Sequence, residues 1–104
     1  MQSKILTLPS IIASCKDNNS KEMGGFFEKN LMFKATSSAR IDKKDGRQHV
    51  QLPSKSFVWH THPLNQGFWP SYEDLTSAIR LEHKLHLIIT AFGVWIIKPL
   101  KRNV

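Results

Sequence analysis

A chain of 104 residues is long enough for one modest hydrophobic core and too short for two, so we expect a single domain over residues 1–104. Its 40% hydrophobic and 10% aromatic residues are ordinary for a globular protein and argue against global disorder. The formal charge of +7 would attract polyanions or an acidic protein surface, but the basic residues are scattered and no recognisable nucleic-acid module surrounds them. We therefore interpret the charge as serving solubility.

Cysteine usage and hydropathy indicate the compartment. Cys15 is the only cysteine, so no intrachain disulfide can form, and we expect it to be a small apolar core residue. Pro9 interrupts the apolar N-terminal patch, and no stretch approaches the roughly 20 apolar residues that span a bilayer. We expect an intracellular, cytoplasmic protein without a membrane partner.

The N-terminal half predicts one helix and several strands. Residues 1–8 are weakly typical of a strand or an extended lead-in, and Pro9 then introduces a short helix that contains Ile11 and Cys15. Strands are predicted over 22–28 and 31–36, and the Gly24-Gly25 pair in the first permits close approach of a neighbouring backbone. An exposed loop or hairpin over 37–47 and a short strand over 49–52 follow.

The C-terminal half predicts a strand, a helix and a hairpin. The apolar run 57–59 is a strand, and a helix begins after Ser71. The apolar residues of its buried face are Leu75, Ala78, Ile79, Leu81 and Leu85. His83 and His86 would then lie at the C-terminal end of that helix, where histidines interact favourably with the helix dipole. Residues 87–91 predict a buried central strand, and 94–98 its hairpin partner after a turn at Phe92-Gly93.

His60 and His62 are the residues that point most clearly to chemistry. Strand side chains alternate, so two histidines one residue apart at the end of an apolar strand lie on the same face and can reach one ion. Asp74 falls in the first turn of the following helix, and the short loop between can return its carboxylate to the imidazoles. Two histidines and one carboxylate leave a fourth tetrahedral position for water, as in a catalytic zinc site.

Each of these signals has a simpler explanation when taken alone. Ser71-x-x-Asp74 is also the pattern of a capping box, two strand histidines can simply be exposed, and Glu22 can be a solvated residue at the end of a loop. Their conjunction in one short chain favours the metal site.

Three segments together resemble the JAMM (MPN-type) zinc metalloprotease family. They are Glu22-Met23-Gly24-Gly25-Phe26, His60-Thr61-His62-Pro63 and Pro70-Ser71-Tyr72-Glu73-Asp74, and the resemblance extends from about Pro9 to the C-terminus. One departure is that eight residues separate His62 from Ser71, against seven in the usual family pattern. The extra residue lies in the loop 64–69 and affects the path of that loop more than the set of ligands.

The resemblance implies an α-β-α sandwich that binds one zinc ion per chain through His60, His62 and Asp74. It implies that Glu22 is the general base and that Ser71 donates to the carbonyl oxygen as that atom gains negative charge. The reaction implied is hydrolysis of an amide or isopeptide bond, with peptides or ubiquitin-like conjugates as the substrate class. Residues 75–85 lead from Asp74 almost directly into the next strand, so the chain has no room for the second insertion that family members that cleave ubiquitin chains usually carry. Either a minimal enzyme acts on simple or flexible substrates, or a partner subunit supplies substrate recognition.

Two other functions are compatible with the sequence. A non-catalytic MPN-type scaffold would use the same fold for assembly, although such members typically lose the ligands that are present here. A basic nucleic-acid-associated module would explain the charge of +7. We also expect Leu64 and Phe68, in the loop after the histidines, to line a groove for an extended substrate segment, whereas Trp69 can equally pack onto the helix.

Overall fold

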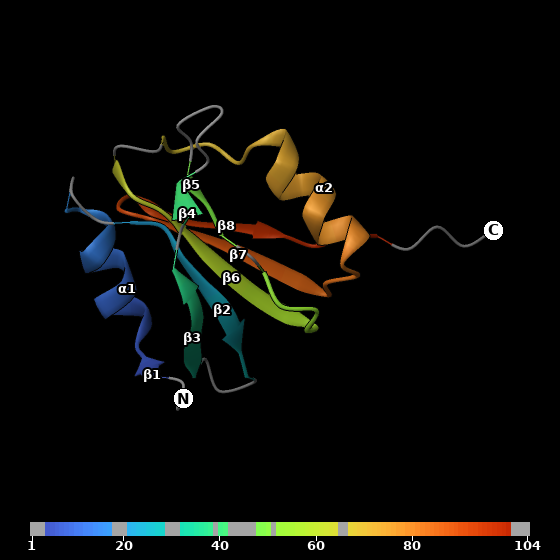
Figure 1. Ribbon diagram of the computed structural model, residues 1–104, viewed down its shortest axis with the longest axis horizontal. Coiled ribbons are helices and arrows are strands. Elements are labelled where there is room, and N and C mark those ends of the chain that lie inside the picture. Colours follow the sequence, from blue (N-terminus) through green and yellow to red (C-terminus); the bar gives the residue numbers. More distant parts are fainter. Residues whose placement is uncertain are drawn as a thin grey trace.

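A six-stranded sheet with a helix on each face organises the described part of the chain (Figure 1). The computed structural model describes residues 4–17, 21–28, 32–38, 40–41, 48–50, 52–64 and 67–100. The strand order is β1-β3-β2-β6-β7-β8, and all neighbours are antiparallel except the parallel pair β6 and β7. The bounds are β1 Lys4–Leu6, β2 Met23–Phe27, β3 Phe33–Ser38, β6 Phe57–His62, β7 Leu85–Thr90 and β8 Gly93–Ile97. The predicted α/β class with a mixed, mostly antiparallel sheet is confirmed.

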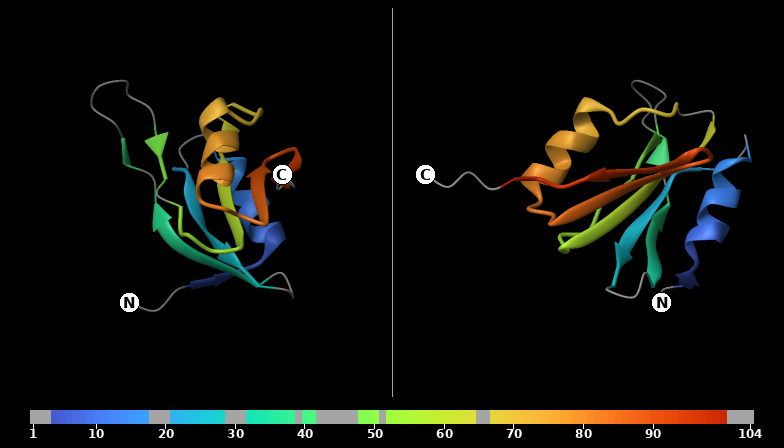
Figure 2. Two further views of the ribbon diagram at one scale, coloured as in Figure 1. Left: turned by 90° about the vertical axis from the view of Figure 1, so that its right-hand side faces the viewer. Right: turned by 180° about the vertical axis from the view of Figure 1, so that it is seen from behind.

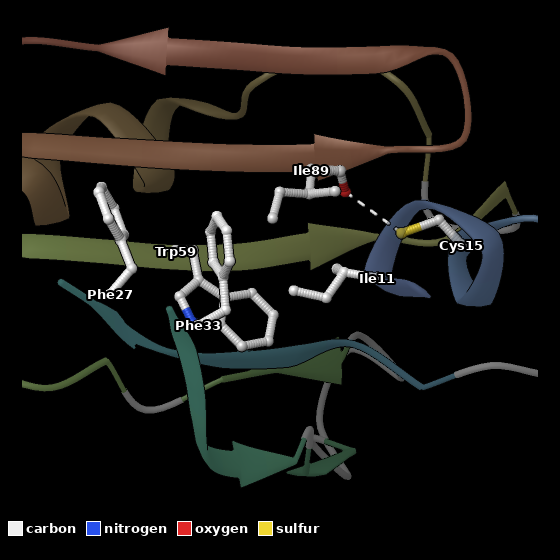
Figure 3. Close-up of a cluster of buried hydrophobic side chains, with 6 residues drawn as sticks. All are labelled: Ile11, Cys15, Phe27, Phe33, Trp59 and Ile89. Carbon is white, nitrogen blue, oxygen red and sulfur yellow. Dashed lines mark hydrogen bonds between the residues drawn. The ribbon is translucent and has the colours of Figure 1, made fainter. Parts of the chain in front are cut away.

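One face of the sheet forms the hydrophobic core. Side chains alternate along each strand, so Trp59 of β6 and Ile89 of β7 point to the same side, where helix α1 (Leu8–Cys15) covers them. Figure 3 shows Ile11 and Cys15 of α1 packed against this cluster, with the Cys15 thiol donating to the backbone oxygen of Ile89 at 3.4 Å. Cys15 is fully buried, which confirms it as a core residue, and burial raises the pKa of its thiol to about 11.

Helix α1 begins where the sequence predicts it. Thr7 has extended backbone angles and caps the helix, because its side chain accepts from the backbone N–H of Ser10 at 3.3 Å. The Ser10 hydroxyl accepts from the Thr7 backbone N–H in return, which completes a capping box, and Pro9 occupies a position in the first turn where no N–H is needed.

The opposite face of the sheet carries helix α2 (Tyr72–Arg80), which connects the parallel strands β6 and β7 (Figure 2). Parallel neighbours require such a crossover because their ends are far apart. His60, His62, His86 and Thr90 are buried on this face, whereas the core face is almost entirely apolar. The sheet therefore separates a structural side from a polar side.

Helix α2 ends earlier than predicted. Glu82 adopts a positive φ of 56°, the N–H of His83 bonds to the oxygen of Ala78, and that of Glu82 bonds to the oxygen of Ile79. These are the two bonds of a Schellman motif, which stops the helix. His83 therefore lies just after the end of α2, whereas Leu85 and His86 belong to β7, so the prediction of a position at the helix C-terminus is wrong for His86. No glycine marks the stop, and the apolar spacing continues past it.

Gly25 allows β2 and β3 to approach closely, as the paired glycines predict. The register between these strands shifts between Gly24 and Gly25, and a Cβ on Gly25 would collide with the backbone oxygen of Lys34. Any larger residue at position 25 would push β3 away from β2 and disturb β2, the strand that directly follows Glu22.

A second, two-stranded sheet pairs β4 (Arg40–Ile41) with β5 (Gln48–His49). The antiparallel pairing agrees with the predicted hairpin, while residues 42–47 lie outside the described residues. β3 extends to Ser38, beyond its predicted end, and the strand expected over 49–52 is instead β5. Neither described helix is long and apolar enough to cross a membrane.

Candidate metal centre

His60 and His62 lie at the carboxyl end of β6, side by side on the face that α2 covers. In the register, His60 pairs with Gly24 of β2 and Ile88 of β7, and His62 pairs with Thr90. Both histidines are buried, with exposed fractions of 3% and 6%. Their Nε2 atoms are 3.1 Å apart, so the alternation of the strand brings the two imidazoles to one point as predicted.

Asp74 completes the group from the first turn of α2. Its Oδ1 lies 3.1 Å from His60 Nε2, and its Oδ2 lies 3.2 Å from His62 Nε2. The cap of the helix sets this orientation, because the Ser71 backbone N–H donates to Asp74 Oδ2 at 2.8 Å. The sequence prediction that a short loop returns this carboxylate to the histidines is confirmed.

The three residues have the donor atoms and spacing of a metal site. One ligand atom from each of His60, His62 and Asp74 can be chosen so that all lie within 4.8 Å of one another. Bond lengths of about 2.0–2.1 Å in a tetrahedral zinc site imply ligand atoms about 3.3–3.4 Å apart. The N–N distance of 3.1 Å is close to this value, and the N–O distances of 3.1 and 3.2 Å reach Oδ1 and Oδ2 of Asp74, respectively. The group could therefore hold a metal ion.

Protonation in this group also favours a cation. Burial lowers the pKa of His60, and the neighbouring Asp74 opposes this effect without cancelling it. Burial alone would raise the pKa of the Asp74 carboxyl, but hydrogen bonds from His60 and His62 outweigh it and hold that pKa well below its usual range. A neutral imidazole and an ionised carboxylate are the forms that bind metals, so His60 and Asp74 need little deprotonation near neutral pH.

Glu22 is buried immediately before β2. If the register of β2 with β6 continues by two residues from the Gly24–His60 pair, Glu22 lies opposite His62, and paired residues share a face of the sheet. The Met23 backbone N–H donates to the Thr61 hydroxyl at 2.8 Å, which fixes the start of β2 beside the histidines. Glu22 is not one of the three clustered ligands found among the described residues, which fits a role beside the metal.

Ser71 is the cap of α2, which was the simpler explanation of its pattern. Its Oγ accepts from the Asp74 backbone N–H at 3.1 Å, and Asp74 Oδ2 accepts from the Ser71 backbone N–H, so a capping box is present. A hydroxyl has a proton to donate as well as lone pairs, so this bond leaves the Ser71 O–H available. Capping and donation to a substrate oxygen are therefore compatible roles.

His86 is a site residue that the sequence interpretation missed. It is fully buried, and its Nε2 lies 2.6 Å from His60 Nδ1. The predicted helix extends to residue 85, five residues past the end of α2 at Arg80, and therefore placed His86 at the end of a helix and not in a strand. The alternation of Leu85, Leu87 and Ile89, which lie in the core or pack against it, is a strand signal that would have placed His86 on the opposite face, with His60 and His62.

A small pocket opens beside His62 at the carboxyl ends of β6 and β7. It is lined by His62, Leu64, Gly67, Phe68, Thr90, Ala91 and Phe92. A hydrogen bond connects the segment between β6 and α2 to β8: the Trp95 indole N–H donates to the Phe68 backbone oxygen at 2.9 Å. Trp69 is 70% exposed, and its ring packs against that of Trp95 in β8, with ring centroids 5.1 Å apart. Leu64 and Phe68 do line a pocket next to a candidate ligand.

No protein-family model, curated protein or solved structure matches this chain. The resemblance to JAMM metalloproteases therefore depends on the motif residues and on the site they form.

Proposed function

We propose that this protein is a zinc-dependent metallopeptidase or isopeptidase, with His60, His62 and Asp74 as the metal ligands. The observation that carries the proposal is the convergence of two buried imidazole nitrogens and one carboxylate at separations of 3.1 and 3.2 Å. Hydrogen bonding alone explains this poorly, because two Nε2 atoms that both donate to Asp74 cannot also bond to each other. A cation at their centre would satisfy all three groups.

The donor set favours zinc among the common metals. Imidazole and carboxylate donors in a four-coordinate site suit Zn²⁺, whereas Mg²⁺ and Ca²⁺ prefer six or more oxygen ligands. Three protein ligands leave a position for water, which distinguishes a catalytic zinc site from a closed structural one.

The chain's own groups then have distinct tasks in amide hydrolysis. Zinc bound there would supply a water with a pKa of about 7 and polarise the substrate carbonyl. Glu22, buried at the start of β2, would take a proton from that water and deliver it to the leaving amine. The Ser71 hydroxyl would donate to the carbonyl oxygen as it becomes negative.

The resemblance supports ubiquitin or ubiquitin-like conjugates, or simpler peptides, as the substrate class. Between Asp74 and β7 the chain holds only the rest of α2 and a four-residue turn over 81–84, so no insertion is available there for substrate binding. A partner subunit that supplies recognition is the corresponding proposal for a conjugated substrate.

The two rival functions predict different properties. A non-catalytic scaffold would not require metal, and the complete ligand set argues against it. A nucleic-acid module would be retained on DNA in a manner that falls steeply with salt. We favour the enzyme because the site geometry explains particular residues, whereas the charge of +7 is spread over the chain.

The decisive experiment measures zinc in protein purified without added metal. We expect about one zinc per chain by elemental analysis, strong loss in His60→Ala and Asp74→Ala, and normal content in His83→Ala, a control at a buried histidine outside the ligand group. Peptidase or isopeptidase activity should disappear with a chelator and return with zinc. Full zinc content in His60→Ala would disprove the ligand assignment, and zinc binding without any hydrolysis would leave a metal-binding scaffold.

A further inference from the structure

A third histidine lies directly behind the candidate ligand His60. In the parallel register, His86 of β7 pairs with Val58 and is therefore on the same face as His60. The two rings are in edge contact, with centroids 4.8 Å apart, and His86 Nε2 is 2.6 Å from His60 Nδ1. Both side chains are buried, so water does not compete for this bond.

A histidine at this position requires an explanation. Its strand neighbours on the same face, Val58 and Ile88, are fully buried and apolar. An apolar residue would be buried there without the cost of removing an imidazole from water. The other ring nitrogen of His86, Nδ1, is buried and has no hydrogen-bond partner among the described residues. Within that part of the chain, the His86 side chain is therefore within hydrogen-bonding distance of His60 alone.

The chemistry of a histidine ligand supplies that explanation. A neutral imidazole that binds a metal through Nε2 carries its proton on Nδ1, and this N–H needs an acceptor. Such an acceptor fixes the tautomer and the orientation of the ring. For His60, the atom in position to accept is His86 Nε2.

We propose that His86 is a positioning residue, whose Nε2 accepts a hydrogen bond from His60 Nδ1–H and so holds His60 Nε2 toward His62 and Asp74. This inference rests on the proposed function only in that a metal binds the group, and it does not depend on the reaction. Without metal, Asp74 accepts from His60 Nε2–H, so His60 Nδ1 accepts from His86 Nε2–H. With metal, each ring moves its proton from Nε2 to Nδ1, and the bond between the rings reverses with no net change in their protons.

Three variants test this proposal by metal affinity. His86→Leu removes the acceptor, whereas His86→Gln keeps an acceptor oxygen on a side chain of similar reach. His83→Leu is the matched control, because His83 is also buried and touches the His86 ring but bonds to the Pro53 oxygen at 3.2 Å. Zinc affinity would be measured by competition with a chromophoric chelator, together with the melting temperature of each metal-free protein.

We expect His86→Leu to weaken zinc binding by about 10–100-fold, the range for loss of a partner of a ligand histidine. His86→Gln should recover most of this loss, and His83→Leu should bind zinc within about threefold of the wild type. In the zinc-loaded wild type, ¹⁵N NMR should show the proton of His60 on Nδ1.

Either of two results would overturn the proposal. Zinc affinity in His86→Leu equal to that of the wild type would show that His60 needs no acceptor. Equal losses in His86→Leu, His86→Gln and His83→Leu that follow their melting temperatures would show that His86 serves packing alone. If zinc does not bind the wild type, the proposed function fails first, and that outcome is distinct from both.

Discussion

At the scale of single residues, Asp74 links the local structure of a helix to the candidate site. Its backbone N–H and its carboxylate both take part in the cap of α2, and the same carboxylate faces His60 and His62. Helix N-termini favour negative charge, which helps to keep this carboxylate ionised. The proposed role of Asp74 as a ligand therefore depends on a well-formed start of α2.

Glu22 provides the sharpest test of chemistry at this scale. We expect Glu22→Gln to keep its zinc and to lose peptidase activity by about 10²-fold or more, because removal of a general acid–base group has effects of this order. The measurements are zinc content and kcat on one substrate. Glu28→Gln is a matched control, since Glu28 is exposed and pairs with Lys34 at 3.1 Å on the surface. Loss of zinc in Glu22→Gln would instead make Glu22 a ligand.

At the scale of elements, Ser71 at the start of α2 caps the helix and is proposed to donate to the substrate, and one substitution can separate the two roles. Glycine at a cap position costs only a few tenths of a kcal/mol relative to serine, while alanine costs about 1 kcal/mol. Ser71→Gly should therefore keep the stability and zinc content of the protein near those of the wild type. If the hydroxyl donates to the reacting carbonyl, activity should fall by about 10²–10³-fold. Unchanged kcat in this variant would restrict Ser71 to capping.

The loop between β6 and α2 supports a second prediction at this scale. The Phe68 ring contacts Trp69, Phe92 and Trp95, with centroid distances of 5.5–5.6 Å, and it also lines the pocket beside His62. We expect Phe68→Ala to lower kcat/KM while zinc content and melting temperature stay near wild type, because the pocket side of the ring would meet substrate. Tyr72→Ala, at an exposed position on α2, is the control. A large fall in melting temperature without a kinetic defect would show that the loop is core.

At the scale of the whole molecule, the sheet separates an apolar face from a face that buries several histidines. The face under α1 buries apolar and aromatic side chains that stabilise the fold, and the face under α2 buries histidines that cost desolvation. The stability from the first face offsets the cost of the second. This division predicts that acid destabilises the metal-free protein through the histidine face.

The pH dependence follows from the histidine pKa values. Burial, then the neighbouring His60 and His83, lowers the pKa of His86 to about 3, and burial lowers that of His60. A depressed folded-state pKa means that the unfolded chain binds more protons below about pH 6.5. The free energy of unfolding of the metal-free protein should therefore fall as the pH drops from about 6.5 toward 3, by up to about 1.4 kcal/mol per pH unit for each such histidine.

Urea unfolding of the metal-free protein at several pH values measures this effect. His86→Leu should have a shallower slope because one of the buried histidines is gone. A free energy of unfolding that is constant between pH 7 and 4.5 would contradict the prediction.

Much of this architecture could be predicted from local sequence. Pro9 marked the start of α1, the apolar run of β6 ended in two histidines on one face, and Ser71 with Asp74 marked the start of α2. Alternation, capping and turn formation depend on neighbouring residues, so their signals are present in the chain itself. The candidate ligand set His60, His62 and Asp74 followed from these local rules plus the shortness of one loop.

Other features depended on contacts between distant segments and were decided by the tertiary structure. The end of α2 is set by a Schellman motif at Glu82, a residue that has no special preference for positive φ, so spacing alone carried the helix too far. The contact of His86 with His60 requires the parallel pairing of β6 and β7, which joins residues 26 positions apart. Sequence patterns determined which side chains could bind a metal, and strand pairing decided which residue supports them, because pairing follows the packing of the whole sheet and not the preferences of its parts.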